Sequence, residues 1–145
     1  MMKKHGFMPV IWGLACFMGA ASAFGDEAAY YRQKAEQAFA DQRYLQAASF
    51  AAQALSENRR DRQMHILLIL ASDKMGAGRG HVSDLYQQAL MLYPASPKLL
   101  AHAAGFYQRN GNPGYAGQLA NAFEKACRFN CIDYRKIITA ERQTN

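Results

Sequence analysis

Two cysteines four residues apart, Cys127 and Cys131, could carry chemistry as metal ligands, as a redox pair or as a disulfide. A metal site needs more ligands than two thiolates, and the candidate histidines, at 65, 81 and 102, are far from the pair in sequence. A redox pair is usually C-x-x-C beside a βαβ unit, and neither feature is present. We therefore predict a structural disulfide, with no metal and no cofactor, and keep a small thiol or metal carrier built on this pair as the alternative.

No other arrangement of residues indicates catalysis. The motifs G-x-S-x-G, H-E-x-x-H and C-x-x-C-H are absent from the sequence. The glycine-rich segment GAGRG at residues 76–80 follows a helical stretch rather than a strand, so its glycines suit a turn better than a phosphate site. His65 and His102 fall in apolar helical segments, where a packed imidazole is the commoner explanation. We therefore expect that the protein is not an enzyme.

The N-terminal segment has the order of a secretory signal. A short basic head precedes an apolar run from residue 7 to about residue 20, and small residues follow at 21–23. This order predicts a signal peptide at residues 1–23 and a periplasmic or secreted protein. An N-terminal membrane anchor and a lipoprotein modified at Cys16 are the alternatives.

The charge of the exported part is mildly basic. Removing residues 1–23 takes away Lys3, Lys4 and no acid, so the formal net charge falls from +6 to +4 over 122 residues, a length that suits one modest domain. The one basic cluster, Asn58–Arg62, is interrupted by an aspartate and is typical of a solvated turn. No basic stripe with interleaved aromatic residues is present, so nucleic acid is not an expected partner. Two cysteines in an exported chain also fit one disulfide.

The body of the chain from Asp26 onward predicts helices alone. It is rich in Ala, Gln, Leu, Glu and Arg, and its apolar residues recur at helical spacing. Turn-forming segments interrupt this pattern at intervals that imply helices of about a dozen residues joined by short turns. We therefore predict an all-α fold of tandem antiparallel helix hairpins, with seven helices after the signal peptide and no sheet.

Three segments of the body, at about residues 28–61, 64–96 and 97–131, are similar when the predicted hairpins are aligned. Small residues recur at equivalent places in their two helices: Ala35, Ala71 and Ala104 in the first, and Ala54, Ala89 and Ala126 in the second. The separations are 36, 33, 35 and 37 residues, which indicates an internal repeat.

This repeat resembles the tetratricopeptide repeat family, whose unit is 34 residues long. The first segment matches the spacing of the family without a gap, through Tyr31, Ala35, Tyr44, Ala47, Ala54 and Leu55. The second keeps Pro94, the proline that closes the unit, and the third needs extra residues around 112–117. The resemblance implies a repeat domain over residues 24–145. An ordinary bundle of alanine-rich helices is the alternative.

In this family the first helices of successive hairpins line a concave groove that holds a peptide or helix of a partner. Carried over by spacing, the groove positions implied here are Arg32, Glu36, Phe39, Leu68, Met75, Gln108 and Arg109, together with Ser72, Ala101 and Gly105. Phe39, Leu68 and Met75 would converge as apolar anchors. Glu36 stands where chaperone-binding members carry an asparagine of their carboxylate clamp, so that clamp is not expected.

A helix at about residues 131–142 is predicted to cap the array, because stacked repeats need a polar end. Asn130 is expected as its N-cap residue, with Asp133 in its first turn. Together with the predicted signal peptide, the resemblance implies an exported protein-interaction module that holds another protein in an envelope assembly, such as a secretion, pilus or cell-wall complex. Association with the membrane through that partner stays open.

Overall fold

The computed structural model describes residues 23–143. That part of the chain contains seven helices and no strand: α1 (Ala23–Ala40), α2 (Tyr44–Glu57), α3 (Arg62–Lys74), α4 (Arg79–Leu92), α5 (Pro97–Arg109), α6 (Pro113–Ala126) and α7 (Ile132–Gln143). The all-α prediction is confirmed for these residues. The predicted signal peptide lies outside them except for Ala23, and so does Cys16.

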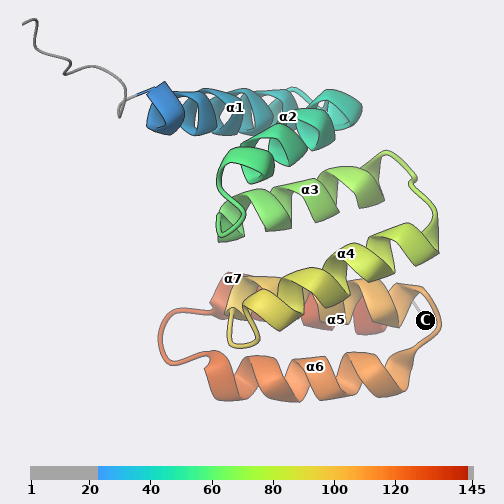
Figure 1. The fold of residues 1–145 in the computed structure, drawn as a ribbon. Helices are drawn as coiled ribbons and strands as arrows, with labels where there is room; N and C mark the ends of the chain where they lie inside the picture. Colours follow the sequence, from blue (N-terminus) through green and yellow to red (C-terminus); the bar gives the residue numbers. More distant parts are fainter. Residues whose placement is uncertain (1–22, 144–145) are drawn as a thin grey trace, which may run out of the picture.

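Consecutive helices pair as hairpins, α1 with α2, α3 with α4 and α5 with α6 (Figure 1). The hairpins are stacked, because α2 also packs on α3 and α4 also contacts α5. The seventh helix, α7, packs against α5 and lies partly behind it in Figure 1. The predicted tandem array with a final additional helix is therefore present.

Side-chain caps fix where three of the helices begin. Asp61, Ser96 and Asn112 precede α3, α5 and α6, and each accepts a hydrogen bond from the backbone N–H three residues further on, at 3.1, 3.5 and 3.2 Å. Each bond satisfies an N–H group that the first turn leaves unpaired. Pro97 and Pro113 occupy the first helical positions of α5 and α6, where a missing N–H is tolerated.

Four of the connections contain a residue with left-handed backbone, at Gln42, Gly76, Gly111 and Asn130, and two of these bear on the predicted turns. Gly76, which follows Met75 at the end of α3, has φ +77°, a conformation that glycine adopts without strain. The predicted turn at GAGRG begins here and ends where α4 starts at Arg79. Asn130 has φ +49°, whereas an N-cap residue has extended backbone. The expected N-cap role of Asn130 is therefore wrong: it bends the loop before α7, in a conformation that asparagine tolerates. Asp133 does lie in the first turn of α7.

The core consists of two clusters that meet at α3. The first joins α1, α2 and α3, and seven of its nine buried residues are alanines: Ala35, Ala38, Ala47, Ala48, Ala51, Ala54 and Ala71, with Met64 and Leu67. The second joins α3 to α7 and contains larger side chains, among them Leu99, Leu100, Phe106 and Phe123. Ile66 and Ile69 face this second cluster, so α3 buries apolar side chains on two sides.

Small residues lie where the helices cross, as the repeat alignment suggests. Five of the six aligned alanines are at most 2% exposed: Ala35, Ala54, Ala71, Ala89 and Ala104. The sixth, Ala126, is half-buried and packs against the second cluster.

None of the helices described here combines the length and apolarity that a bilayer crossing requires.

Candidate functional site

A pocket of about 250 Å³ lies where the first helices of the three hairpins meet. Glu36 and Phe39 of α1 form one side, and Lys98 of α5 lies on its lining as well. Side chains of α3 complete the lining: Gln63, Ile66, Leu67 and Leu70. We call this hollow the first-helix groove. Apolar side chains from α1 and α3 form most of its surface, and the two charged residues on it, Glu36 and Lys98, have opposite signs.

The predicted groove residues on α1 lie together. The Arg32 guanidinium donates to Glu36 Oε1 at 3.3 Å and to Asp61 Oδ2, at the start of α3, also at 3.3 Å. About half of the side-chain surface of Arg32 and of Glu36 stays exposed, so the ion pair between them adds little to stability. Glu36 lines the groove, whereas Arg32 is not among its lining residues and meets the groove only through its ion pair with Glu36.

Phe39 lines the groove but is also part of the packing. Its side chain is half-buried against the first cluster, and its ring meets Tyr44 edge to face with 5.5 Å between centroids. Phe39 therefore lies on the groove, as predicted, and also stabilises the first hairpin by packing on Tyr44, which the sequence did not indicate.

The predicted convergence of Phe39, Leu68 and Met75 is wrong for Leu68. Leu68 lines a different pocket, of about 280 Å³, formed by α2, α3 and α4. Met75 follows the last residue of α3 with its side chain exposed, and it does not contribute to the lining of the first-helix groove. Residues 66–70 are a continuous apolar run, so helical spacing alone could not identify which of them face the groove.

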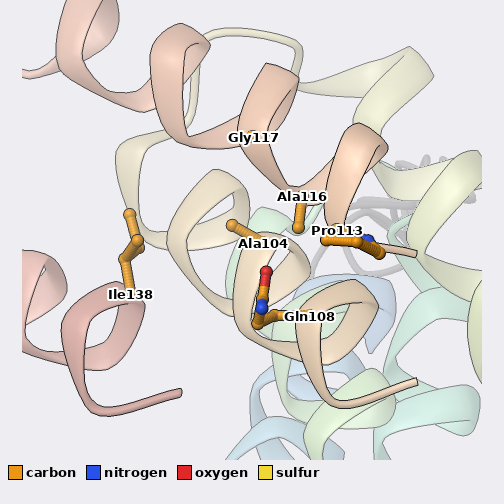
Figure 2. A pocket seen from close by; sticks show the side chains of 6 residues that line it. All are labelled: Ala104, Gln108, Pro113, Ala116, Gly117 and Ile138. Carbon is orange, nitrogen blue, oxygen red and sulfur yellow. The ribbon is translucent and has the colours of Figure 1, made fainter. Parts of the chain in front are cut away.

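The predicted groove residues on α5 point to different sides. Arg109 donates to Asp73 Oδ2 of α3 at 2.8 Å, whereas Gln108 lines a small pocket of about 80 Å³ between α5, α6 and α7. Figure 2 shows Gln108 and Ala104 of α5 at this pocket, with Ile138 of α7 on the other side. The remaining expected positions, Ser72, Ala101 and Gly105, are buried, so the expectation that they face an open groove is wrong.

Two titratable side chains inside the array, His102 and Tyr86, have pKa values that are shifted by burial. His102 is half-buried on α5, where loss of hydration and the nearby charges of Lys98 and Arg109 lower its pKa to about 4, so the imidazole is neutral at pH 7. Burial raises the pKa of Tyr86 well above its ordinary value.

No group of three or more His, Cys, Asp or Glu residues within residues 23–143 is arranged to hold a metal ion.

The predicted cysteine pair is joined in the structure. The sulfur atoms of Cys127 and Cys131 are 1.95 Å apart, and their Cα atoms are 6.1 Å apart. Cys127 directly follows α6 and Cys131 directly precedes α7, so the bond spans the corner between these helices. We call residues 127–131 the disulfide corner.

Sequence reasoning missed Gln63 and Lys98, which face the groove from the first turns of α3 and α5. Their separation of 35 residues, close to the spacing of the repeat, is the signal that could have paired them.

No protein-family model matches this sequence, and no curated protein matches it. The class of protein that the fold defines is an all-α array of stacked helix hairpins, with α7 packed on its last hairpin.

Proposed function

We propose that this chain is an exported, tetratricopeptide-like interaction module that binds a segment of another protein within an envelope assembly such as a secretion, pilus or cell-wall complex. The observation that carries the proposal is the first-helix groove, which draws its lining from three successive hairpins. Such a hollow needs all three hairpins in register, and it offers apolar surface to a partner that can cover it.

The tetratricopeptide-like part of the proposal is supported by the sequence repeat. Aligned alanines recur at separations of 33 to 37 residues, and those separations coincide with the succession of hairpins along the chain. Export is supported by the order of residues 1–23 and by the paired cysteines, because disulfides persist in oxidising compartments.

The chemistry of the groove suggests how a segment would be held. Leu67, Leu70 and Phe39 can pack against apolar side chains of the partner, since covering such surface is the main driving force of association. Glu36 and Lys98, of opposite charge, can fix the direction in which the segment lies.

The test is site-specific photo-crosslinking in the envelope of cells that export the protein. A photoreactive amino acid in place of Glu36 should yield an adduct with a distinct partner. The same amino acid in place of Leu45, which is 71% exposed on α2, is the control and should give little or none. Melting temperatures of both variants check that the fold is intact. Equal adducts at both positions, or none at Glu36, would refute binding in the groove.

A further inference from the structure

A second pocket, of about 330 Å³, borders the disulfide corner and adjoins the first-helix groove. The two pockets lie side by side, because Gln63, Ile66 and Lys98 line both of them. The second pocket is completed by the first residues of α3 and α5, by the disulfide corner and by Tyr134 of α7. Three parts of the chain that are distant in sequence therefore meet here: the start of α3, the start of α5, and the segment from the disulfide corner to Tyr134.

Phe129 is the most exposed large apolar side chain described, with 90% of its surface open to solvent. It lies in the middle of the disulfide corner and on the rim of the second pocket. The disulfide closes a short loop around Phe129, so the backbone that carries this ring is already restricted before any partner arrives. Pre-organised aromatic residues of this kind contribute strongly to binding, because little conformational freedom is lost when they are covered.

The charged residues lining the second pocket are both cations, Arg62 and Lys98. The nearest acids in sequence are already engaged: Asp61 accepts from Arg32 and from the backbone of α3, and Asp133 accepts from Lys136 at 3.1 Å. The pocket therefore presents positive charge beside an exposed aromatic ring, which complements a ligand that carries both carboxylates and apolar side chains.

We infer that the disulfide corner binds an acidic segment of a partner polypeptide. Phe129 packs on an apolar side chain of that segment, and Arg62 and Lys98 pair with its carboxylates. A polypeptide is favoured over a nucleic acid because a phosphate backbone is held by a row of cations, whereas this pocket offers two. The inference rests on the proposed function, since it names the chemistry of the bound partner, but Arg62 and Phe129 are not part of the first-helix groove.

The test uses the chain purified after export and a fluorescent peptide of alternating Glu and Leu, with binding followed by anisotropy. The matched peptide of alternating Gln and Leu should bind about tenfold more weakly, and added salt should weaken the Glu peptide selectively. Phe129→Ala should weaken the Glu peptide by about tenfold. Arg62→Gln and Lys98→Gln should each weaken it about three- to fivefold.

Two controls separate the corner from general surface effects. Arg60→Gln removes an exposed cation of the same basic cluster outside the pocket lining, and Leu45→Ala removes an exposed apolar side chain on α2. Both should leave the affinity unchanged. Equal affinity for the Glu and Gln peptides, or equal effects of Arg60→Gln and Arg62→Gln, would overturn the inference.

Other occupants would also overturn it. A concentration-dependent dimer that Phe129→Ala abolishes would identify a second copy of the chain as the occupant. Binding to phosphatidylglycerol vesicles without binding to the Glu peptide would identify a membrane surface. If the peptide results fail while the Glu36 adduct is retained, the corner is rejected and the proposed function stands. Loss of the Glu36 adduct, with the peptide results retained, rejects the groove instead.

Discussion

Arg109 at the end of α5 donates a hydrogen bond to Asp73 near the end of α3, with 2.8 Å between Nη2 and Oδ2. The two residues are 36 positions apart, close to one repeat. At the opposite ends of the same helices, Lys98 Nζ donates to Gln63 Oε1 at 3.4 Å, 35 positions apart. Polar contacts thus join corresponding ends of two successive first helices and hold them in register.

The Arg109–Asp73 ion pair should contribute only modestly to stability. Its side chains remain 40% and 28% exposed, and partly exposed pairs typically contribute about 0.2–1 kcal/mol. A double-mutant cycle with Arg109→Ala and Asp73→Ala, measured by urea unfolding, isolates this coupling from the other contacts of each residue. A coupling energy above about 2 kcal/mol would show that the pair is shielded from water more than its exposure indicates.

Alanines at helix crossings should not tolerate enlargement. Ala51 of α2 is fully buried, so Ala51→Leu forces extra volume between α1, α2 and α3 and should lower the free energy of unfolding by about 1–3 kcal/mol. The neighbouring Ala52 is exposed, and Ala52→Leu should change stability by less than about 0.5 kcal/mol. Chemical denaturation of the two variants provides the comparison. If both variants lose similar free energies of unfolding, the cause is the difference in helix propensity between Ala and Leu rather than packing.

Phe39 and Met75, both predicted from the sequence as groove anchors, should now behave differently. Phe39 is half-buried and packs on Tyr44, so Phe39→Ala should lower the free energy of unfolding by about 1–2 kcal/mol, less than the 3–5 kcal/mol of a fully buried aromatic residue. Met75 is 43% exposed, and Met75→Ala should be nearly neutral. Thermal melting and the yield of the Glu36 adduct should be measured in each background. A neutral Phe39→Ala would assign that ring to binding alone.

The sequence predicted the hairpin architecture well because helix length, turn residues and small crossing residues are local or periodic signals. In GAGRG, for example, Gly76 takes up the left-handed conformation that ends α3, so the turn can be located from the sequence alone. The groove was predicted less well. Leu68 and Leu70 are equally apolar, and only tertiary packing decides that Leu70 faces α1 and α5 while Leu68 faces α2 and α4. Phe129 gave no periodic signal at all, because it lies in a loop.

His102 should make stability depend on pH. Its pKa is about 4 in the folded chain and about 6.5 when unperturbed, so between these values the unfolded state binds the proton more readily. Stability is therefore full above pH 6.5 and falls as the pH drops toward 4, by at most about 1.4 kcal/mol per pH unit. His102→Gln should flatten this part of the profile, measured by urea unfolding across the range. His81→Gln, at an exposed position on α4, is the matched control and should keep the slope.

Removing the disulfide should weaken the corner without unfolding the array. A loop this short gains little chain entropy when it is opened, so replacing both Cys127 and Cys131 by serine should lower the free energy of unfolding by about 2 kcal/mol. Calorimetry measures the change, and thiol counting before and after reductant gives the oxidation state of the pair. Two free thiols in unreduced protein, with metal bound on purification, would favour the carrier alternative.

The division of the core at α3 sets where the molecule opens first. The cluster under α1 and α2 is built mostly of alanines, which bury little apolar area each, whereas the cluster around α5 contains leucines and aromatic rings. Amide hydrogens of the first hairpin are therefore expected to exchange through partial opening, while those of α5 exchange through global unfolding. Glu36 and Phe39 belong to that hairpin, so a ligand in the first-helix groove would tie down the least stable part of the chain and slow its exchange.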